Sequence, residues 1–264
     1  MGGKHRVAAN LNMLFTHVPL IQRYAYAASA GFKLVEVSIP YSEPAQKLRE
    51  AADAHKLQHT LINAPPGDWN DGFRGMAALK SKKDEFRNSL DQAIEYAQTL
   101  DCGRIHVMAG IPKTDDDAAH AAQTYTENVL YAAHKLKEHD LMCLIEPINR
   151  YTIPGYHLNS YDDAVTLIEK DESKNLKILY DIFHAQQISG QILPTLKKWQ
   201  EHIAYIQVAQ VPERGACDSR GELDYSYIFE KIEHMDPKWI IGAEYVSHET
   251  PTPFKWIEDM GLSF

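Results

Sequence analysis

The chain has 264 residues, 44% of them hydrophobic and 24% charged, which is the composition of an ordinary soluble globular protein. A formal net charge of -9 argues against a nucleic-acid partner, because phosphate binding needs a basic face, and it disfavours an anionic membrane surface. No stretch approaches the roughly 18 apolar residues of a membrane span, so no membrane partner is expected. The first residues lead into a short strand rather than into a secretory signal. The three cysteines form no CxxC pair, so a reducing, cytoplasmic compartment is predicted.

Short apolar runs alternate with segments of helical periodicity along the whole chain. The runs predict eight strands at 6–10, 33–38, 58–63, 104–109, 141–146, 177–181, 203–208 and 239–244. Helices are predicted at 19–30, 43–55, 86–100, 115–136, 160–168, 185–199, 224–232 and 253–260. An acidic first turn at 115–117 and capping residues at Ser160 and Asp224 support three of these helices.

Strict alternation of strands and helices predicts a parallel sheet. Eight such units in roughly 250 residues match a (β/α)8 barrel, so we predict one TIM-barrel domain over residues 1–264. An open doubly wound sheet is the alternative, although the glycine-rich phosphate loops that often accompany it are absent.

Two long connections, 64–75 and 211–221, follow the third and seventh predicted strands. Both leave the carboxyl end of a strand, which is the face where barrels of this kind have their active sites. With its glycines and Trp69 or Phe73, the first connection is a candidate mobile lid, and an ordinary irregular loop is the alternative.

Oxygen-bearing side chains lie near the ends of the last four predicted strands. They are Glu146, Asp181, Gln207 and Glu244. In a barrel these strand ends converge, and three carboxylates without a cation would repel one another and raise their pKa values. Carboxylate and amide oxygens suit hard cations, so this pattern predicts a site for a divalent metal, Mg²⁺ or Mn²⁺. Any one of these acids alone could instead cap a turn or form a salt bridge, so the prediction depends on the barrel.

Further polar residues near the strand ends are candidates for substrate contact. His184 follows Asp181 by three residues and could donate a hydrogen bond to a substrate, or cap the next helix instead. His106 alternates with Met108 and is expected to line the barrel, and Asn63 precedes the first long connection. Asn10 and Glu36 also lie at strand ends, and each of these residues could equally be a satisfied polar group of the core.

Several motifs, spread along the chain, carry a family resemblance. They are LINAPPGD at 61–68, RIHVMAG at 104–110, LIEPIN at 144–149, DIFH at 181–184 and IQVAQVPERG at 206–215. Together they resemble the hydroxypyruvate isomerase family, which is similar to the xylose-isomerase-like barrels. The match runs from ANL at 9–11 to GAEY at 242–245.

The resemblance implies roles for the strand-end residues. Glu146 and Glu244 would be the catalytic acid/base pair and, with Asp181 and Gln207, the metal ligands. Related sugar isomerases and epimerases commonly have histidine at the position of Gln207, whereas glutamine is expected for this family. The implied substrate is hydroxypyruvate, interconverted with tartronate semialdehyde, although relatives act on longer 2-oxo acids such as 2-oxotetronate.

The implied reaction passes through an enediolate, with one glutamate removing a proton and the other returning one. Arg214, in the second long connection, could hold the substrate carboxylate bidentately, or form a salt bridge within its loop to Glu213 or Asp218.

Other functions use the same fold. A metal-dependent nuclease acting on damaged DNA would need more histidine and a basic face. A ketose epimerase and a non-catalytic metabolite-binding barrel are further alternatives, and a homo-oligomer is compatible with the sequence.

Overall fold

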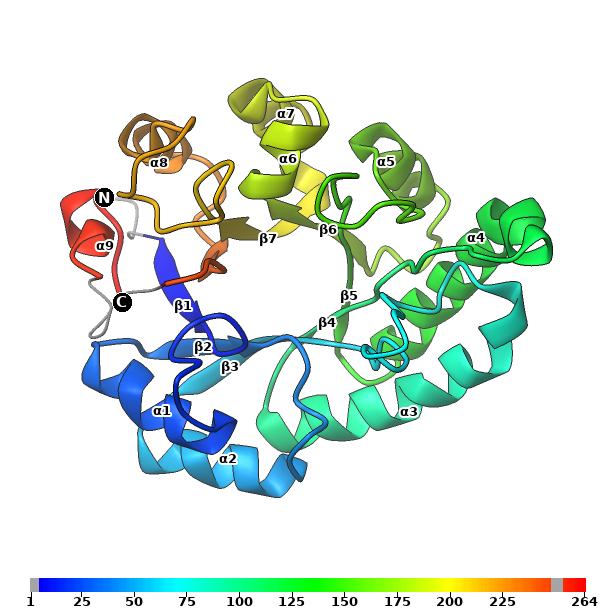
Figure 1. Ribbon diagram of the computed structural model, residues 1–264, viewed down its shortest axis with the longest axis horizontal. Helices are drawn as coiled ribbons and strands as arrows, with labels where there is room; N and C mark the ends of the chain where they lie inside the picture. The colour runs from blue at the N-terminus through cyan, green and yellow to red at the C-terminus, as the bar shows by residue number, and fades with distance from the viewer. Residues whose placement is uncertain (1–4, 248–253) are drawn as a thin grey trace.

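The protein is a closed barrel of eight parallel strands surrounded by helices (Figure 1). The computed structural model describes residues 5–247 and 254–264. Neighbouring strands pair in chain order, and β8 pairs with β1 to close the barrel. The strands are β1 (Arg6–Asn10), β2 (Leu34–Val37), β3 (Gln58–Asn63), β4 (Arg104–His106), β5 (Met142–Ile145), β6 (Leu176–Asp181), β7 (Ile203–Val208) and β8 (Ile240–Ala243). The predicted TIM barrel is confirmed.

Helices cover the outside of the barrel. They are α1 (Leu20–Ser29), α2 (Ala45–Ala54), α3 (Lys83–Leu100), α4 (Asp115–Lys137), α5 (Tyr161–Glu169), α6 (Ile182–Ile188), α7 (Ile192–Lys198), α8 (Tyr225–Ile232) and α9 (Trp256–Asp259), with 3₁₀ turns η1 (Lys80–Lys82) and η2 (Gln200–His202). Ser160 and Asp224 cap α5 and α8 as predicted, since each side chain accepts a hydrogen bond from a backbone N–H three residues later.

Some predicted element bounds were wrong. The predicted helix 185–199 is two helices, because Gly190 and Gln191 have left-handed backbone conformations, with φ of 62° and 52°, that interrupt the helix. Strand β4 ends at His106 rather than at 109, and Ala109 instead forms an antiparallel bridge with Gly75. The last helix has only four residues, and Pro253, where it was predicted to begin, is outside the described residues.

Two apolar clusters fill the molecule. The larger lies between the strands and the surrounding helices, and it includes most of the buried helix faces. The smaller takes one residue from each of seven strands. All three cysteines are free and buried. Within the described ranges, none of the helices combines the length and apolar character that a membrane crossing requires.

Candidate active site

One layer of polar side chains occupies the carboxyl end of the barrel interior. Side chains two residues apart along a strand point to the same side. The small apolar cluster consists of Ala8, Leu34, Leu61, Leu144, Leu179, Tyr205 and Ile240. Two positions later stand Asn10, Glu36, Asn63, Glu146, Asp181, Gln207 and Gly242, all within these strands except Glu146, which directly follows β5. Glu146 therefore follows an apolar strand because its position faces the barrel interior, at the end where TIM barrels have their active sites.

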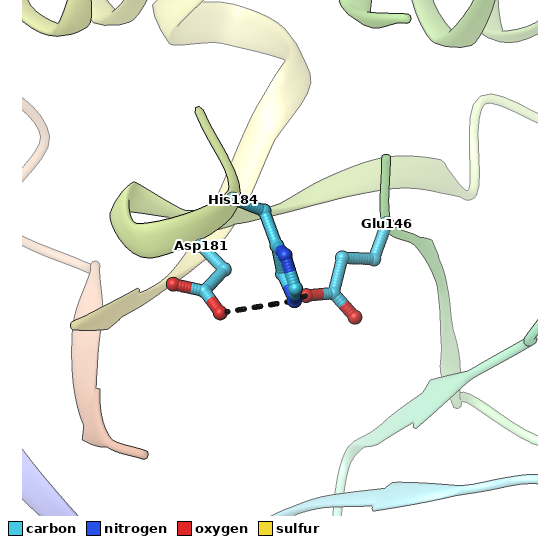
Figure 2. A group of neighbouring side chains, drawn as sticks. All are labelled: Glu146, Asp181 and His184. Carbon is cyan, nitrogen blue, oxygen red and sulfur yellow. Dashed lines mark ion pairs between the residues drawn. The ribbon is translucent and has the colours of Figure 1, made fainter. Parts of the chain in front are cut away.

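Glu146, Asp181 and His184 form a compact buried group (Figure 2). One ligand atom from each lies within 4.8 Å of the others. Nε2 of His184 is 3.5 Å from Oδ2 of Asp181 and 3.7 Å from Oε1 of Glu146. Helix α6 begins at Ile182, directly after β6, and Oδ1 of Asp181 caps it by accepting a hydrogen bond from the N–H of Phe183 at 2.8 Å. The cap is thus Asp181, and the ring of His184 faces the two carboxylates.

The partners of His184 determine which of its ring nitrogens carries the proton. Oδ1 of Asn149 accepts hydrogen bonds from the backbone N–H groups of Tyr151 and Thr152, at 2.9 and 2.8 Å. The amide nitrogen Nδ2 of Asn149 therefore faces Nδ1 of His184, 2.7 Å away. Because Nδ1 accepts this hydrogen bond, the neutral ring has its proton on Nε2. His184 presents an N–H donor to the site.

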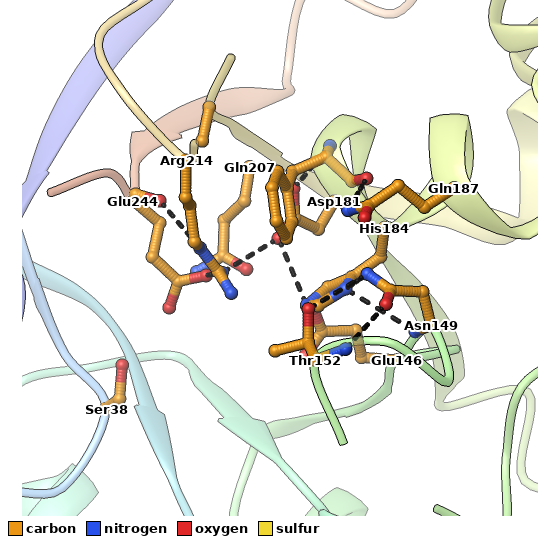
Figure 3. A network of polar contacts seen from close by, with 12 residues as sticks. Ser38, Glu146, Asn149, Thr152, Asp181, His184, Gln187, Gln207, Arg214 and Glu244 are labelled. Atoms are coloured by element: carbon orange, nitrogen blue, oxygen red, sulfur yellow. Dashed lines mark hydrogen bonds and ion pairs between the residues drawn. The ribbon is translucent and has the colours of Figure 1, made fainter. Parts of the chain in front are cut away.

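Arg214 lies between Asp181 and Glu244 (Figure 3). Its Nη2 donates to Oδ2 of Asp181 at 3.1 Å and to Oε2 of Glu244 at 2.5 Å. These ion pairs replace the loop salt bridge to Glu213 or Asp218 that the sequence left open. A guanidinium in this position neutralises part of the negative charge that the two carboxylates bring to the site.

A cavity of about 370 Å³ opens over these groups. Five of the predicted site residues line it: Asn63, Glu146, His184, Arg214 and Glu244. The connection 64–75 adds Trp69 and Arg74, whose guanidinium lies 3.8 Å from the centre of the Trp69 ring. The cavity lining does not include the buried Asp181, Gln207 and His106. Nδ1 of His106 is 3.7 Å from Oε2 of Glu146.

Burial raises the pKa values of the acids of the site and lowers that of His184. The pKa of Glu146 is raised well above its usual value, first by burial and then by the charges of Glu244 and Asp181. Burial raises the pKa of Asp181 to about 7, although Arg214 opposes this shift, and it also raises the pKa of Glu244. Burial lowers the pKa of His184 well below its usual value. Without a cation, this layer therefore retains protons near neutral pH.

The donor atoms of the site fit a divalent cation. Oε1 of Glu146 and Oε1 of Gln207 are both buried without a hydrogen-bond partner among the described residues, and unpaired buried oxygens are costly. Glu146, Asp181 and His184 are close enough together to hold a metal ion. His184 could ligate through Nε2 only by losing the proton that its contact with Asn149 places there, so oxygen donors fit better.

Three residues of the site were not singled out in the sequence. Asn149 and Thr152 orient the histidine, and Arg74 reaches the cavity from the connection 64–75. An asparagine two and three residues before the N–H groups that it binds is a recognisable turn pattern. The role of Arg74 has no comparable local signal, because only the fold brings its loop over the cavity.

A closed parallel barrel with acids, an arginine and a donor histidine around one cavity defines a TIM-barrel enzyme with a candidate metal site. Residues 24–263 match the family described as "Xylose isomerase-like TIM barrel", and the chain belongs to this family. A relative named as a putative hydroxypyruvate isomerase, 67% identical over 264 residues, further places the chain in the hydroxypyruvate isomerase family, a family of isomerases.

Three relatives match nearly the whole chain. A Caenorhabditis elegans protein named "Putative hydroxypyruvate isomerase" is 67% identical over 264 residues, covering 100% of both chains. The "2-oxo-tetronate isomerase" of Cupriavidus necator is 41% identical, over 91% of this chain and 92% of its own. The "Hydroxypyruvate isomerase" of Escherichia coli is 37% identical, over 96% of this chain and 98% of its own.

A solved structure from Brucella melitensis, described as "AP endonuclease, family 2", has a TM-score of 0.91 to this chain. It is 36% identical and covers 97% of this chain and 98% of its own. The similarity extends over the complete barrel.

Proposed function

We propose that the protein interconverts hydroxypyruvate and tartronate semialdehyde by proton transfer between two glutamates, with a divalent cation, Mg²⁺ or Mn²⁺, as cofactor. The observation that carries this proposal is that Glu146 and Glu244, directly after β5 and β8, line the same cavity, while Glu146 has an unpaired buried oxygen. The names of the relatives supply the substrate. A longer 2-oxo acid such as 2-oxotetronate is the second candidate, because another relative bears that name and a cavity of about 370 Å³ leaves room beyond three carbons.

The proton movements follow from the placement of the two carboxylates. One glutamate takes the proton from C3 of hydroxypyruvate, and the other delivers a proton to C2, while O3 loses its proton and O2 gains one. Glu146 would ligate the cation through its unpaired Oε1 and exchange a proton on its other oxygen, whereas Asn10 and Arg214 donate to the two oxygens of Glu244, at 3.0 and 2.5 Å. A cation held by Glu146, Asp181, Gln207 and Glu244 would supply electrostatic stabilisation of the two vicinal substrate oxygens.

Cations and donors around the cavity suit a small acid. Arg214 lines the cavity, and a bidentate contact with the substrate carboxylate would replace part of the hydrogen bonding of its Nη2 to Asp181 and Glu244. His184 provides a neutral N–H donor beside Glu146 and Asp181, and Asn63 lines the same cavity. His106 is proposed to act from behind Glu146 by maintaining the position of its carboxylate.

The proposal is tested with chelator-treated protein and hydroxypyruvate in D₂O, followed by proton NMR with and without Mg²⁺ or Mn²⁺. Metal-dependent formation of tartronate semialdehyde with deuterium at carbon is expected. Turnover of 2-oxotetronate but not of hydroxypyruvate would support the glutamate pair and change the proposed substrate to the longer acid. Failure to turn over either acid with any metal would overturn the proposal.

The tautomer of His184 can be tested with the variant Asn149→Asp. The new carboxylate keeps an oxygen for the two backbone N–H groups but presents an acceptor to Nδ1, so the proton of the neutral ring moves from Nε2 to Nδ1. The site then loses the N–H donor at Nε2 of His184. We expect kcat/KM to fall about 10- to 100-fold above pH 8, which corresponds to the loss of one hydrogen bond to a charged group. A pH–rate profile identical to that of the wild type would contradict this role.

The raised pKa of Asp181 predicts a pH-dependent effect on stability. Its folded-state pKa of about 7 exceeds the ordinary 3.8, so the folded chain binds this proton more tightly, and its stability contribution is lost as pH rises through that interval. In metal-free protein, the melting temperature of Asp181→Asn relative to the wild type should therefore increase as the pH rises from about 5.5 to about 8.

Comparing the variant with the wild type at each pH cancels the opposing contributions of the buried histidines. Mn²⁺ should stabilise the wild type more at the higher pH, because protons compete with the cation for the same carboxylates. A pH-independent difference between the variant and the wild type would contradict the raised pKa.

A further inference from the structure

We infer that Glu36 is a positioning residue that orients the amide of Gln207, so that Oε1 rather than Nε2 faces the metal site. This inference rests on the proposed function, since it takes Gln207 as an oxygen ligand. An amide group offers an oxygen on one side and a hydrogen-bond donor on the other. Only the first can ligate a cation, so the amide must be held in one of its two orientations.

The contact across the barrel determines that orientation. Nε2 of Gln207, on β7, donates to Oε1 of Glu36, on β2, at 2.8 Å. Oε1 of Glu36 accepts from both Asn10 and Gln207, so the amide of Gln207 has its nitrogen toward Glu36 and its oxygen away from it. That oxygen is buried and has no hydrogen-bond partner among the described residues. It belongs to the residue paired in register with Asp181, so it is available to a cation near that carboxylate.

A second amide shares the same carboxylate oxygen. Nδ2 of Asn10 donates to Oε1 of Glu36 at 2.8 Å and to Oε1 of Glu244 at 3.0 Å. Asn10 cannot turn its oxygen toward these groups, because Oδ1 accepts from the backbone N–H groups of Asn12 and Met13, at 2.9 and 3.1 Å. Glu36 therefore links the orientation of Gln207 to the position of the catalytic Glu244.

The barrel makes room for this contact at Gly242. A Cβ atom there would lie 2.4 Å from Oε2 of Glu36 and 2.9 Å from Cγ of Gln207. The backbone of Gly242 is not left-handed, so glycine is needed here for space rather than for conformation. Any side chain at this position would push the carboxylate and the amide apart.

Stability alone does not explain a glutamate at position 36. Its side chain is completely buried, and no ion pair to it is found among the described residues. Burial of a carboxylate without a counter-charge is unfavourable even with the hydrogen bonds from Asn10 and Gln207, and an apolar residue would fill the interior at lower cost. Outer-sphere groups that orient metal ligands are a recognised reason to keep such a residue.

Two conservative variants separate orientation from charge. Glu36→Gln loses the charge but keeps a carbonyl oxygen for Gln207 and Asn10. Glu36→Asp keeps the charge but withdraws it from Gln207 by one methylene. Titration calorimetry of chelator-treated full-length protein with Mn²⁺ should give a dissociation constant raised about 10-fold or more for Glu36→Asp, and changed less than about 3-fold for Glu36→Gln.

A larger loss of Mn²⁺ affinity in Glu36→Gln than in Glu36→Asp would indicate a charge effect. An equal response of the two variants would indicate no role in orienting Gln207. Either result would overturn the inference. If Glu36→Asp does not fold, Glu36→Met, which keeps the length and loses the acceptor, takes its place with the same expectation. Tyr24→Phe is the matched control, because it removes a buried 2.8 Å hydrogen bond to His59, between α1 and β3 and apart from Glu36. It should leave Mn²⁺ binding unchanged.

A double variant provides the second measurement. In a Gln207→Leu background there is no amide left to orient, so Glu36→Asp should cost no further Mn²⁺ affinity. An undiminished loss in that background would show that Glu36 acts independently of Gln207. Failure of the wild type to bind Mn²⁺ would instead reject the proposed metal function, so the two failures are distinguishable.

Discussion

Replacement of Glu146 by glutamine is expected to lower kcat for hydroxypyruvate about 10²- to 10⁴-fold, the contribution of a positioned proton-transfer group. The fold should survive. Burial and the charges of Glu244 and Asp181 raise the pKa of Glu146, which means that the ionised form is disfavoured at this position. A neutral amide removes that penalty, so the melting temperature of the metal-free protein should stay the same or rise.

The measurement combines steady-state kinetics with a thermal melt followed by circular dichroism. Glu169→Gln, an exposed substitution on the outer helix α5, is the matched control and should change neither quantity. Near wild-type turnover of Glu146→Gln would remove this residue from the mechanism. A large drop in melting temperature would show that Glu146 has a structural role that its unpaired oxygen does not suggest.

Arg214→Met is expected to weaken both the metal-free fold and the binding of substrate. Its guanidinium neutralises Asp181 and Glu244, and removing one partner of a buried ion pair typically costs about 3–5 kcal/mol. Mn²⁺ should restore much of this loss, because the cation supplies the missing positive charge. The KM for hydroxypyruvate should rise about 10- to 100-fold through the lost hydrogen bonds to the substrate carboxylate.

Arg220→Met, an exposed change in the same connection, is the control for this experiment. An unchanged KM in Arg214→Met, with a raised KM in Arg74→Met, would show that Arg74 of the connection 64–75 binds the substrate carboxylate. Stability that is unaffected by the loss of Arg214 would show that solvent, rather than this guanidinium, screens the two acids.

Much of the barrel and its candidate ligands can be derived from periodicity alone. The two-residue period of a strand places Glu146, Asp181 and Gln207 on the interior face, two positions beyond the apolar residues Leu144, Leu179 and Tyr205. Element bounds were less predictable. Periodicity shows no interruption between 185 and 199, yet the left-handed conformations of Gly190 and Gln191 divide that segment into two helices.

Partnerships across the barrel could not be derived in this way. Periodicity tells which side of a strand a residue faces, but not which of several opposite groups its polar atoms reach. Arg214 could pair within its own loop, and only the closed barrel brings it between Asp181 and Glu244. The contact between Glu36 and Gln207 likewise joins residues 171 positions apart in sequence. The chain's own pattern therefore determines the barrel and its ring of acids, whereas barrel closure determines their charge balance and the orientation of each donor, because these depend on distances between strands remote in sequence.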